Sequence, residues 1–77
     1  MKIKNVKPKE LLKALIKFGF IVKRQHGSHV FLESITPNGR KKFTSIAIHN
    51  EPLRRGTLHG ILKQTGISEE ELIKLLK

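Results

Sequence analysis

The sequence predicts an α+β fold in which a three-stranded antiparallel sheet carries helices on one face and leaves its other face open. Three observations lead to this prediction. Apolar residues recur at helical spacing near both ends of the chain, apolar and polar residues alternate in the middle as they do in strands, and turn-forming residues separate these segments. Because 77 residues suffice for one modest core, we expect a single domain over residues 1–77.

The first helix is expected to begin near Pro8, where the missing N–H of proline is not needed, and to end at Gly19. Its apolar face comprises Leu11, Leu12, Leu15 and Ile16. Strands are then predicted over residues 20–25, 28–34 and 40–49. A tight turn at His26-Gly27 joins the first two strands, and a loop at residues 36–39 joins the second to the third.

Alternation along the second strand sends its side chains to two different faces of the sheet. Val30 and Leu32 share the face expected to meet the core, whereas His29, Phe31 and Glu33 share the other face. In the third strand the same alternation separates two sets, namely Thr44, Ile46 and Ile48 on one face and Phe43, Ser45 and Ala47 on the other. The sequence therefore predicts a histidine on the open face of the sheet.

The last third of the chain predicts two short helices. Thr57 is expected to cap a helix that ends at Gly66 and buries Leu58, Ile61 and Leu62. Ser68 and Glu71 form a capping box that opens a second helix. Three of the six acidic residues, Glu69 to Glu71, lie in the first turn of that helix, where the helix dipole favours them. This structural explanation is sufficient, so we do not interpret them as catalytic carboxylates or metal ligands.

The charge of the chain indicates a polyanionic partner. Sixteen Lys and Arg side chains oppose six Glu side chains, which leaves a formal net charge of +10. A field of this strength attracts phosphate groups, and a nucleic acid would relieve its self-repulsion. A basic surface that is merely solvated is the alternative. A membrane surface is disfavoured, because no predicted helix pairs a basic face with exposed large aromatic residues.

Composition excludes several kinds of stabilisation and targeting. The chain has no cysteine, which rules out disulfides and thiolate zinc sites and agrees with a reducing cytoplasm as the expected location. Residues 1–12 hold four lysines and no apolar run of secretory length, so we expect no signal peptide. No segment approaches the roughly 18 apolar residues of a membrane span.

Few residues are suited to catalysis. The chain contains no aspartate, no Gly-rich phosphate loop and no paired carboxylates, so a nuclease of this sequence is expected to act without a metal or other cofactor. Histidine, with a reference pKa of about 6.5, is the natural proton-transfer group at neutral pH. The histidines are His26, His29, His49 and His59. His26 is interpreted as an exposed turn residue, His59 as a solvent-facing or partner-facing helix residue, and His49 as either structural or part of a site.

Three stretches of the chain together resemble the HicA toxin family. Gly27-Ser28-His29, within residues 24–31, is similar to the Gly-Ser-His that follows the first hairpin turn in that family. Residues 46–49 and 53–67 match the second characteristic block of the family in order and spacing, and the opening helix also fits. The resemblance covers about residues 5–76.

The resemblance implies a fold similar to the double-stranded-RNA-binding domain, α-β-β-β-α, here with a short extra C-terminal helix. It also implies an mRNA-cleaving endoribonuclease that acts independently of the ribosome, as the toxin of a type II toxin–antitoxin system. The catalytic histidine of the family maps onto His29. The implied partners are mRNA and a HicB-type antitoxin, which masks the active site and through which the complex binds operator DNA.

Two departures from the family patterns limit what the resemblance implies. Ala47 stands where the family often has proline, which leaves the role of His49 open. The tandem-lysine motif of true double-stranded-RNA-binding domains is missing before the second predicted helix, so binding of an RNA duplex is not implied.

Two functions follow as hypotheses. In the first, the chain is a ribonuclease in which His29 activates the 2′-OH or protonates the leaving group. The expected RNA-binding residues around His29 are Lys23, Arg24, Gln25, Ser28, Lys41 and Lys42. In the second, the chain is a noncatalytic basic RNA-binding module. A DNA-binding repressor is disfavoured, because the predicted helix at residues 58–64 is short and turns its apolar residues inward.

Overall fold

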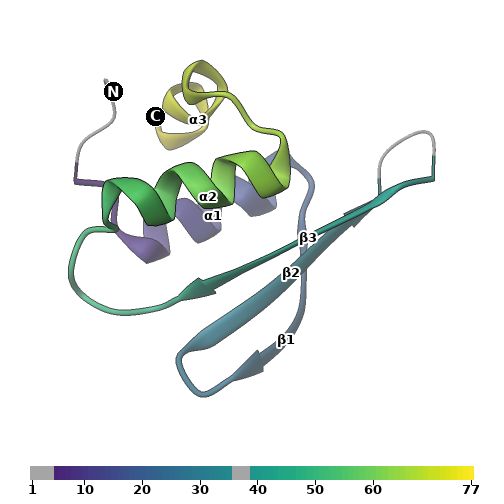
Figure 1. Ribbon diagram of the computed structural model, residues 1–77, viewed down its shortest axis with the longest axis horizontal. Coiled ribbons are helices and arrows are strands. Elements are labelled where there is room, and N and C mark those ends of the chain that lie inside the picture. Colours follow the sequence, from purple (N-terminus) through teal and green to yellow (C-terminus); the bar gives the residue numbers. More distant parts are fainter. Residues whose placement is uncertain (1–4, 36–38) are drawn as a thin grey trace.

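The computed structural model describes residues 5–35 and 39–77, and it confirms the predicted α+β fold with its α-β-β-β-α order and a further C-terminal helix (Figure 1). The elements are α1 (Pro8–Phe18), β1 (Ile21–His26), β2 (His29–Ile35), β3 (Lys41–Ala47), α2 (Arg55–Thr65) and α3 (Glu69–Leu76). Residues 36–38, which make up most of the predicted loop before the third strand, lie outside the described residues.

The three strands form one antiparallel sheet in the order β1-β2-β3. All three helices lie on the same side of this sheet, and the opposite face carries no helix (Figure 1). Val30 and Leu32 of β2 and Ile46 of β3 point toward the helices and are at most 3% exposed, as the alternation predicts. The open face predicted from the sequence is therefore present.

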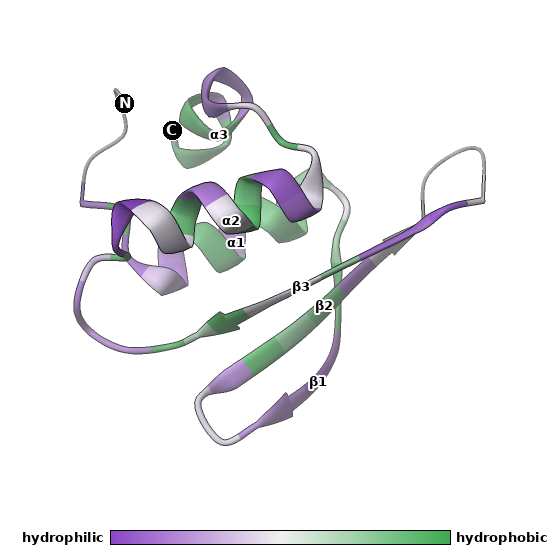
Figure 2. Cartoon of the chain, viewed as in Figure 1, coloured by the Kyte–Doolittle hydropathy of each residue, from purple (hydrophilic) through white to green (hydrophobic). Residues whose placement is uncertain are grey.

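The core lies between the inner face of the sheet and the three helices. Its largest fully buried apolar side chains include Leu11 and Leu15 of α1, Leu32 of β2, Ile46 of β3 and Leu72 of α3. Figure 2 shows the apolar parts of the helices and of β2 and β3 in green, whereas β1 is mostly hydrophilic. Every residue of β1 is exposed, so β1 forms an edge of the sheet that no other element covers.

Helix α1 begins at Pro8 as predicted, and the Oε1 atom of Glu10 accepts a hydrogen bond from the Lys7 backbone N–H at 3.0 Å. Gly19 ends the helix with φ +125°, a conformation that favours glycine. The expectation that Ile16 belongs to the apolar face was wrong, because its side chain is 49% exposed. Ala14 takes that place at 1% exposure, which rotates the buried stripe away from Ile16.

The first hairpin turn lies one residue later than predicted. Its two turn residues are Gly27 and Ser28 instead of His26 and Gly27, since His26 pairs with His29 across the end of the hairpin. Gly27 takes φ +62°, and two-residue turns with glycine first have a twist that matches the flanking strands. His26 is consequently a strand residue.

The start of α2 also differs from the prediction. The sequence favours Thr57 as N-cap, but the helix begins at Arg55 with Arg54 in the capping position. No side chain caps this end. The backbone N–H of Leu53 donates to the Val6 carbonyl at 2.8 Å, and this tertiary hydrogen bond positions the chain just before the helix. Such a constraint between distant segments leaves no local signal in the sequence.

The C-terminal helix follows the predicted capping box. The Ser68 hydroxyl accepts from the Glu71 N–H at 3.1 Å, and the Glu71 carboxylate accepts from the Ser68 N–H at the same distance. Helix α3 packs mainly on α1 and buries Leu72 completely. Among the described residues, no helix is long and apolar enough to span a membrane.

Candidate active site

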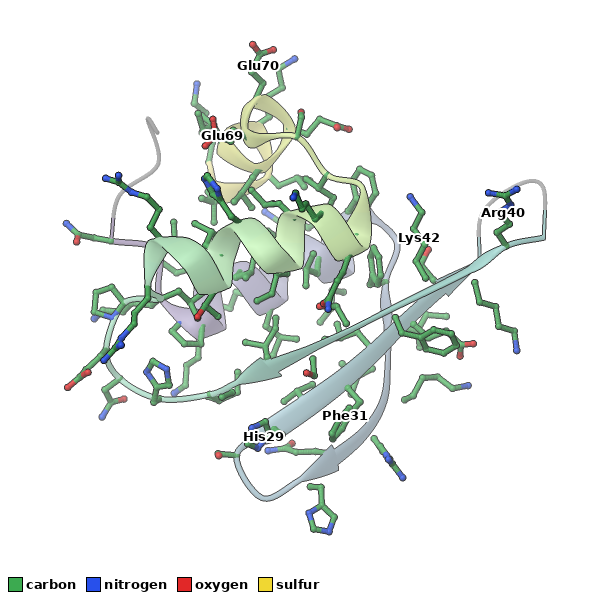
Figure 3. All side chains as sticks on the ribbon, viewed as in Figure 1. His29, Phe31, Arg40, Lys42, Glu69 and Glu70 are labelled. Carbon is green, nitrogen blue, oxygen red and sulfur yellow. The ribbon has the colours of Figure 1, made fainter. Side chains whose placement is uncertain are left out.

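The open face of the sheet presents His29 and some, but not all, of the other residues that the sequence singled out for chemistry. Residues paired across an antiparallel ladder share a face, so His29 and Ala47, Phe31 and Ser45, and Glu33 and Phe43 point away from the helices. His29 is exposed. Figure 3 places His29 at the end of the sheet near the β1–β2 turn, while Arg40 and Lys42 lie at the opposite end.

His26 is the direct cross-strand neighbour of His29. Directly opposite residues in an antiparallel pair have Cβ atoms about 5 Å apart and point to the same face. Both histidines are exposed, so a single substrate can reach both rings. Sequence reasoning interpreted His26 as a turn residue, and the signal that would have found it is the preference of two-residue turns for glycine in their first position.

Arg24 and Phe31 continue this face along the hairpin. Their backbones are cross-strand partners, and the Arg24 guanidinium carbon lies 5.0 Å from the centroid of the Phe31 ring. This cation–π contact holds the guanidinium over the open face. The register of the hairpin shifts between Val22 and Arg24, so Lys23 is an extra residue that breaks the regular alternation. The side chains of Lys23 and Arg24 consequently both contact residues of the open face, although the two residues are adjacent in sequence.

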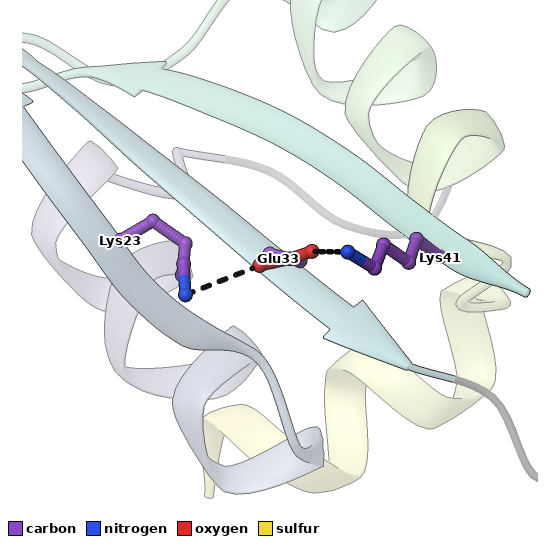
Figure 4. Close-up of polar contacts among 3 residues, drawn as sticks. All are labelled: Lys23, Glu33 and Lys41. Atoms are coloured by element: carbon purple, nitrogen blue, oxygen red, sulfur yellow. Dashed lines mark ion pairs between the residues drawn. The ribbon is translucent and has the colours of Figure 1, made fainter. Parts of the chain in front are cut away.

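Lys23 and Lys41 flank Glu33 on the open face (Figure 4). The Lys23 ammonium lies 3.4 Å from one Glu33 carboxylate oxygen, and the Lys41 ammonium lies 3.5 Å from the other. The two lysine side chains are 59% and 58% exposed, so each can also contact a ligand. Glu33 is four residues from His29 along β2, roughly 13 Å at the usual strand rise. This cluster and His29 therefore cannot contact the same phosphate group.

Lys42 lies on the helix side of the sheet, apart from His29, Arg24 and Lys41. Its ammonium donates to the Thr65 carbonyl at 3.4 Å, at the C-terminal end of α2. A cation at this end interacts favourably with the helix dipole. The alternation that sends Thr44 and Ile46 to the helix side sends Lys42 there too. The same sequence pattern that identified those core positions could thus have separated Lys42 from Lys41.

Gln25 and Ser28 support the turn that positions His29. The Gln25 side-chain amide donates to the Gly27 carbonyl at 3.3 Å. The Ser28 carbonyl accepts from the Ile48 N–H at 2.7 Å, which continues the pairing of β2 and β3 just beyond Ala47. These contacts fix the turn to both neighbouring strands.

The two remaining histidines lie in different surroundings. The third strand ends at Ala47 and not at His49 as predicted, so His49 lies in the segment that leads to α2. His59 belongs to α2, and its Nε2 atom lies 3.6 Å from a Glu69 carboxylate oxygen of α3. Across residues 5–35 and 39–77, no group of three or more His or Glu side chains is arranged to hold a metal ion.

One comparison with known proteins identifies a family for this chain. A search of curated proteins finds no match. A family model for the HicA toxin of bacterial toxin–antitoxin systems matches residues 8–67, a range that contains α1, the whole sheet, α2 and the Gly27-Ser28-His29 sequence. Because this match covers far more than half of the chain, the chain belongs to the HicA toxin family.

Proposed function

We propose that this toxin is an mRNA-cleaving endoribonuclease that acts on unpaired RNA, without a metal ion or the ribosome, and that His29 transfers a proton in the reaction. The observation that supports this most strongly is the pair of exposed histidines, His26 and His29, on a sheet face that also presents Arg24. Glu33, the carboxylate of this face in the described sheet, is already paired with two lysines.

The chemistry needs only groups that this face and the RNA supply. His29 removes the proton of a ribose 2′-OH, and the resulting oxygen attacks the adjacent phosphorus. The O2′–P bond forms, the P–O5′ bond breaks, and the leaving 5′-oxygen takes a proton from His26. The products are a 2′,3′-cyclic phosphate and a free 5′-OH. Arg24, two residues along β1 from His26, stabilises the charge that develops on the phosphate.

The rest of the face binds the RNA on either side of the cleaved bond. Lys23 and Lys41 contact a phosphate some distance from His29, since Glu33 holds them at the far part of the sheet. Phe43 is 62% exposed beside them and offers a ring on which an unpaired base can stack. Gln25 and Ser28 act by holding the turn. Lys42 has no place in this RNA-binding surface, because it supports α2 from the other face.

The family membership implies pairing with an antitoxin. We propose a HicB-type antitoxin that covers the open face and so blocks access to His29, and through which the complex contacts operator DNA. An acidic surface on this partner would match the net charge of +10 of the toxin. The proposed site of action is the cytoplasm, where mRNA is translated, and residues 1–77 are proposed to work as one domain.

Induction of the chain and of a His29→Ala variant in a bacterial host tests this function. The native chain is expected to arrest growth and degrade mRNA, while the variant accumulates to the same level and does neither. Co-expression of the antitoxin should restore growth. Equal behaviour of both chains, with intact mRNA, would exclude the ribonuclease and favour a noncatalytic RNA-binding module.

A further inference from the structure

A pocket of about 570 Å³ lies between β3, the first turns of α2 and the segment that joins them. This volume falls within the roughly 300–1,000 Å³ of typical small-molecule sites. Its lining includes Ala47 at the end of β3, Arg54 and Thr57 at the start of α2, and Asn50 and Glu51 between them.

The pocket adjoins the proposed catalytic histidine. Ala47 lines the pocket and is the cross-strand partner of His29, so the two Cβ atoms lie about 5 Å apart. Ser45, also in the lining, is the cross-strand partner of Phe31. A molecule bound in the pocket therefore lies next to His29.

Both ends of the segment that walls the pocket are fixed by backbone hydrogen bonds. The Ile48 N–H donates to the Ser28 carbonyl at 2.7 Å, and the Leu53 N–H donates to the Val6 carbonyl at 2.8 Å. The Leu58 N–H then donates to the Arg54 carbonyl at 3.0 Å and begins α2. The pocket is thus formed before a ligand arrives, which lowers the entropic cost of binding.

The lining suits a nucleobase better than a lone phosphate. The apolar part of the lining includes Ala47, Leu53 and Ile61. The lining also includes two exposed polar residues, namely Asn50, whose amide both donates and accepts, and Glu51, whose carboxylate can accept from exocyclic amino groups. The Arg54 guanidinium can stack on a base. The negative charge of Glu51 repels a simple anion and so disfavours its binding.

We propose that this pocket binds the base of one unpaired nucleotide next to the cleaved bond, and that Asn50 and Glu51 determine which base is preferred there. The inference rests on the proposed ribonuclease function. It adds a specificity site to that function, since the pocket would select where in an mRNA the His29 chemistry takes place.

Cleavage sites mapped on a random-sequence single-stranded RNA pool test the proposal. The native chain is expected to prefer one base at a fixed position beside the cut. Asn50→Ala and Glu51→Gln should each change that preference by about tenfold and leave other positions unaffected. Arg54→Ala should weaken it as well. Arg55→Ala is the matched control, because it removes a neighbouring charge that does not line the pocket, and it should keep the native preference.

Two outcomes of the mapping would overturn the proposal while leaving the ribonuclease intact. One is cleavage in which the pocket variants keep the native base preference, or in which no preference exists. The other is an equal effect of Arg54→Ala and Arg55→Ala, which would reflect general electrostatic attraction to RNA.

A binding measurement separates the pocket from the catalytic claim. Backbone amide signals of the His29→Ala protein are followed by NMR as uncleavable 2′-deoxy trinucleotides of each base are added. Shifts concentrated at residues 50, 51, 53, 54 and 57, and larger for one base, support the pocket even if the native chain proves inactive. Signals there that stay unchanged with every trinucleotide, but move when antitoxin is added, would assign the pocket to the protein partner instead.

Discussion

Two histidines that are paired across the end of the β1–β2 hairpin are the basis of the proposed chemistry. The resemblance of Gly27-Ser28-His29 to a family motif predicted His29. The place of His26 in β1 was not predicted, because the two turn residues were assigned one position too early. The identity of these turn residues sets the register of the whole hairpin. Lys23 is a similar case. The register shift beside it arises from hydrogen bonding between strands, which the local sequence does not reveal.

The cross-strand pairing of His26 with His29 predicts a large effect of His26 on the rate of RNA cleavage. His26→Gln removes the proposed proton donor and should lower kcat by about 100-fold or more, with little change in KM. Purified protein and a short RNA suffice for the measurement. His59→Gln serves as the control, because His59 lies on α2 near Glu69 and away from the open face. A His26→Gln protein as fast as the control would remove His26 from the mechanism.

Glu33 is expected to limit the proposed binding of RNA, because its carboxylate forms ion pairs with Lys23 and Lys41 on the open face. Glu33→Gln should therefore tighten RNA binding several-fold and steepen its dependence on salt, since more lysine–phosphate contacts release more counterions. The affinity is measured in the His29→Ala background at several salt concentrations. Unchanged or weaker binding would show that Lys23 and Lys41 do not contact RNA.

At the scale of elements, the sequence predicted the type and order of every helix and strand and missed some of their ends. Periodicity identifies a helix or strand because it reflects which side chains face the core. The start of α2 depends instead on a hydrogen bond between Leu53 and Val6, two residues far apart in sequence. The fit of α2 on β3 is likewise tertiary, since Thr44 donates to the Gln64 side-chain oxygen at 2.9 Å.

Adjacent lysines of β3 are expected to have separate roles. Lys42→Met should lower the free energy of unfolding by about 1 kcal/mol, because it removes the cation at the C-terminal end of α2, and should leave RNA binding close to native. Lys41→Met should weaken RNA binding and leave stability nearly unchanged, since an exposed ion pair contributes little. Each variant is the charge-matched control of the other in urea unfolding and RNA titration. Identical effects of the two would contradict the assigned faces.

At the scale of the whole molecule, three helices cover one face of the sheet, and the other face, where we propose that the partners bind, carries no helix (Figure 1). The predicted α+β fold followed from composition and pattern, since a sheet with one apolar face must be covered on that face alone. The net charge of +10 predicted a polyanionic binding partner. Neither the sequence pattern nor the charge could predict the pocket beside His29, because the pocket forms where β3, α2 and their connection meet.

Helix α3 is expected to be indispensable for the fold, although the family match ends at residue 67. Leu72 is fully buried against the core, so Leu72→Ala should lower the unfolding free energy by about 2–5 kcal/mol, a large share for so small a domain. Ile73→Ala, at a half-buried neighbouring position, is the control and should cost less. Urea titration followed by circular dichroism gives both values. A Leu72→Ala protein as stable as the control would show that α3 packs loosely.

The chemical nature of the RNA ends produced by the purified chain tests the central claim most directly. The native protein, treated with EDTA, is incubated with a single-stranded RNA and with the same RNA carrying 2′-deoxyribose at the cut. We expect 2′,3′-cyclic phosphate and 5′-OH ends from the first RNA, no cleavage of the second, and no activity from His29→Ala. Products with 3′-OH and 5′-phosphate ends, or cleavage that EDTA abolishes, would contradict a histidine-based ribonuclease.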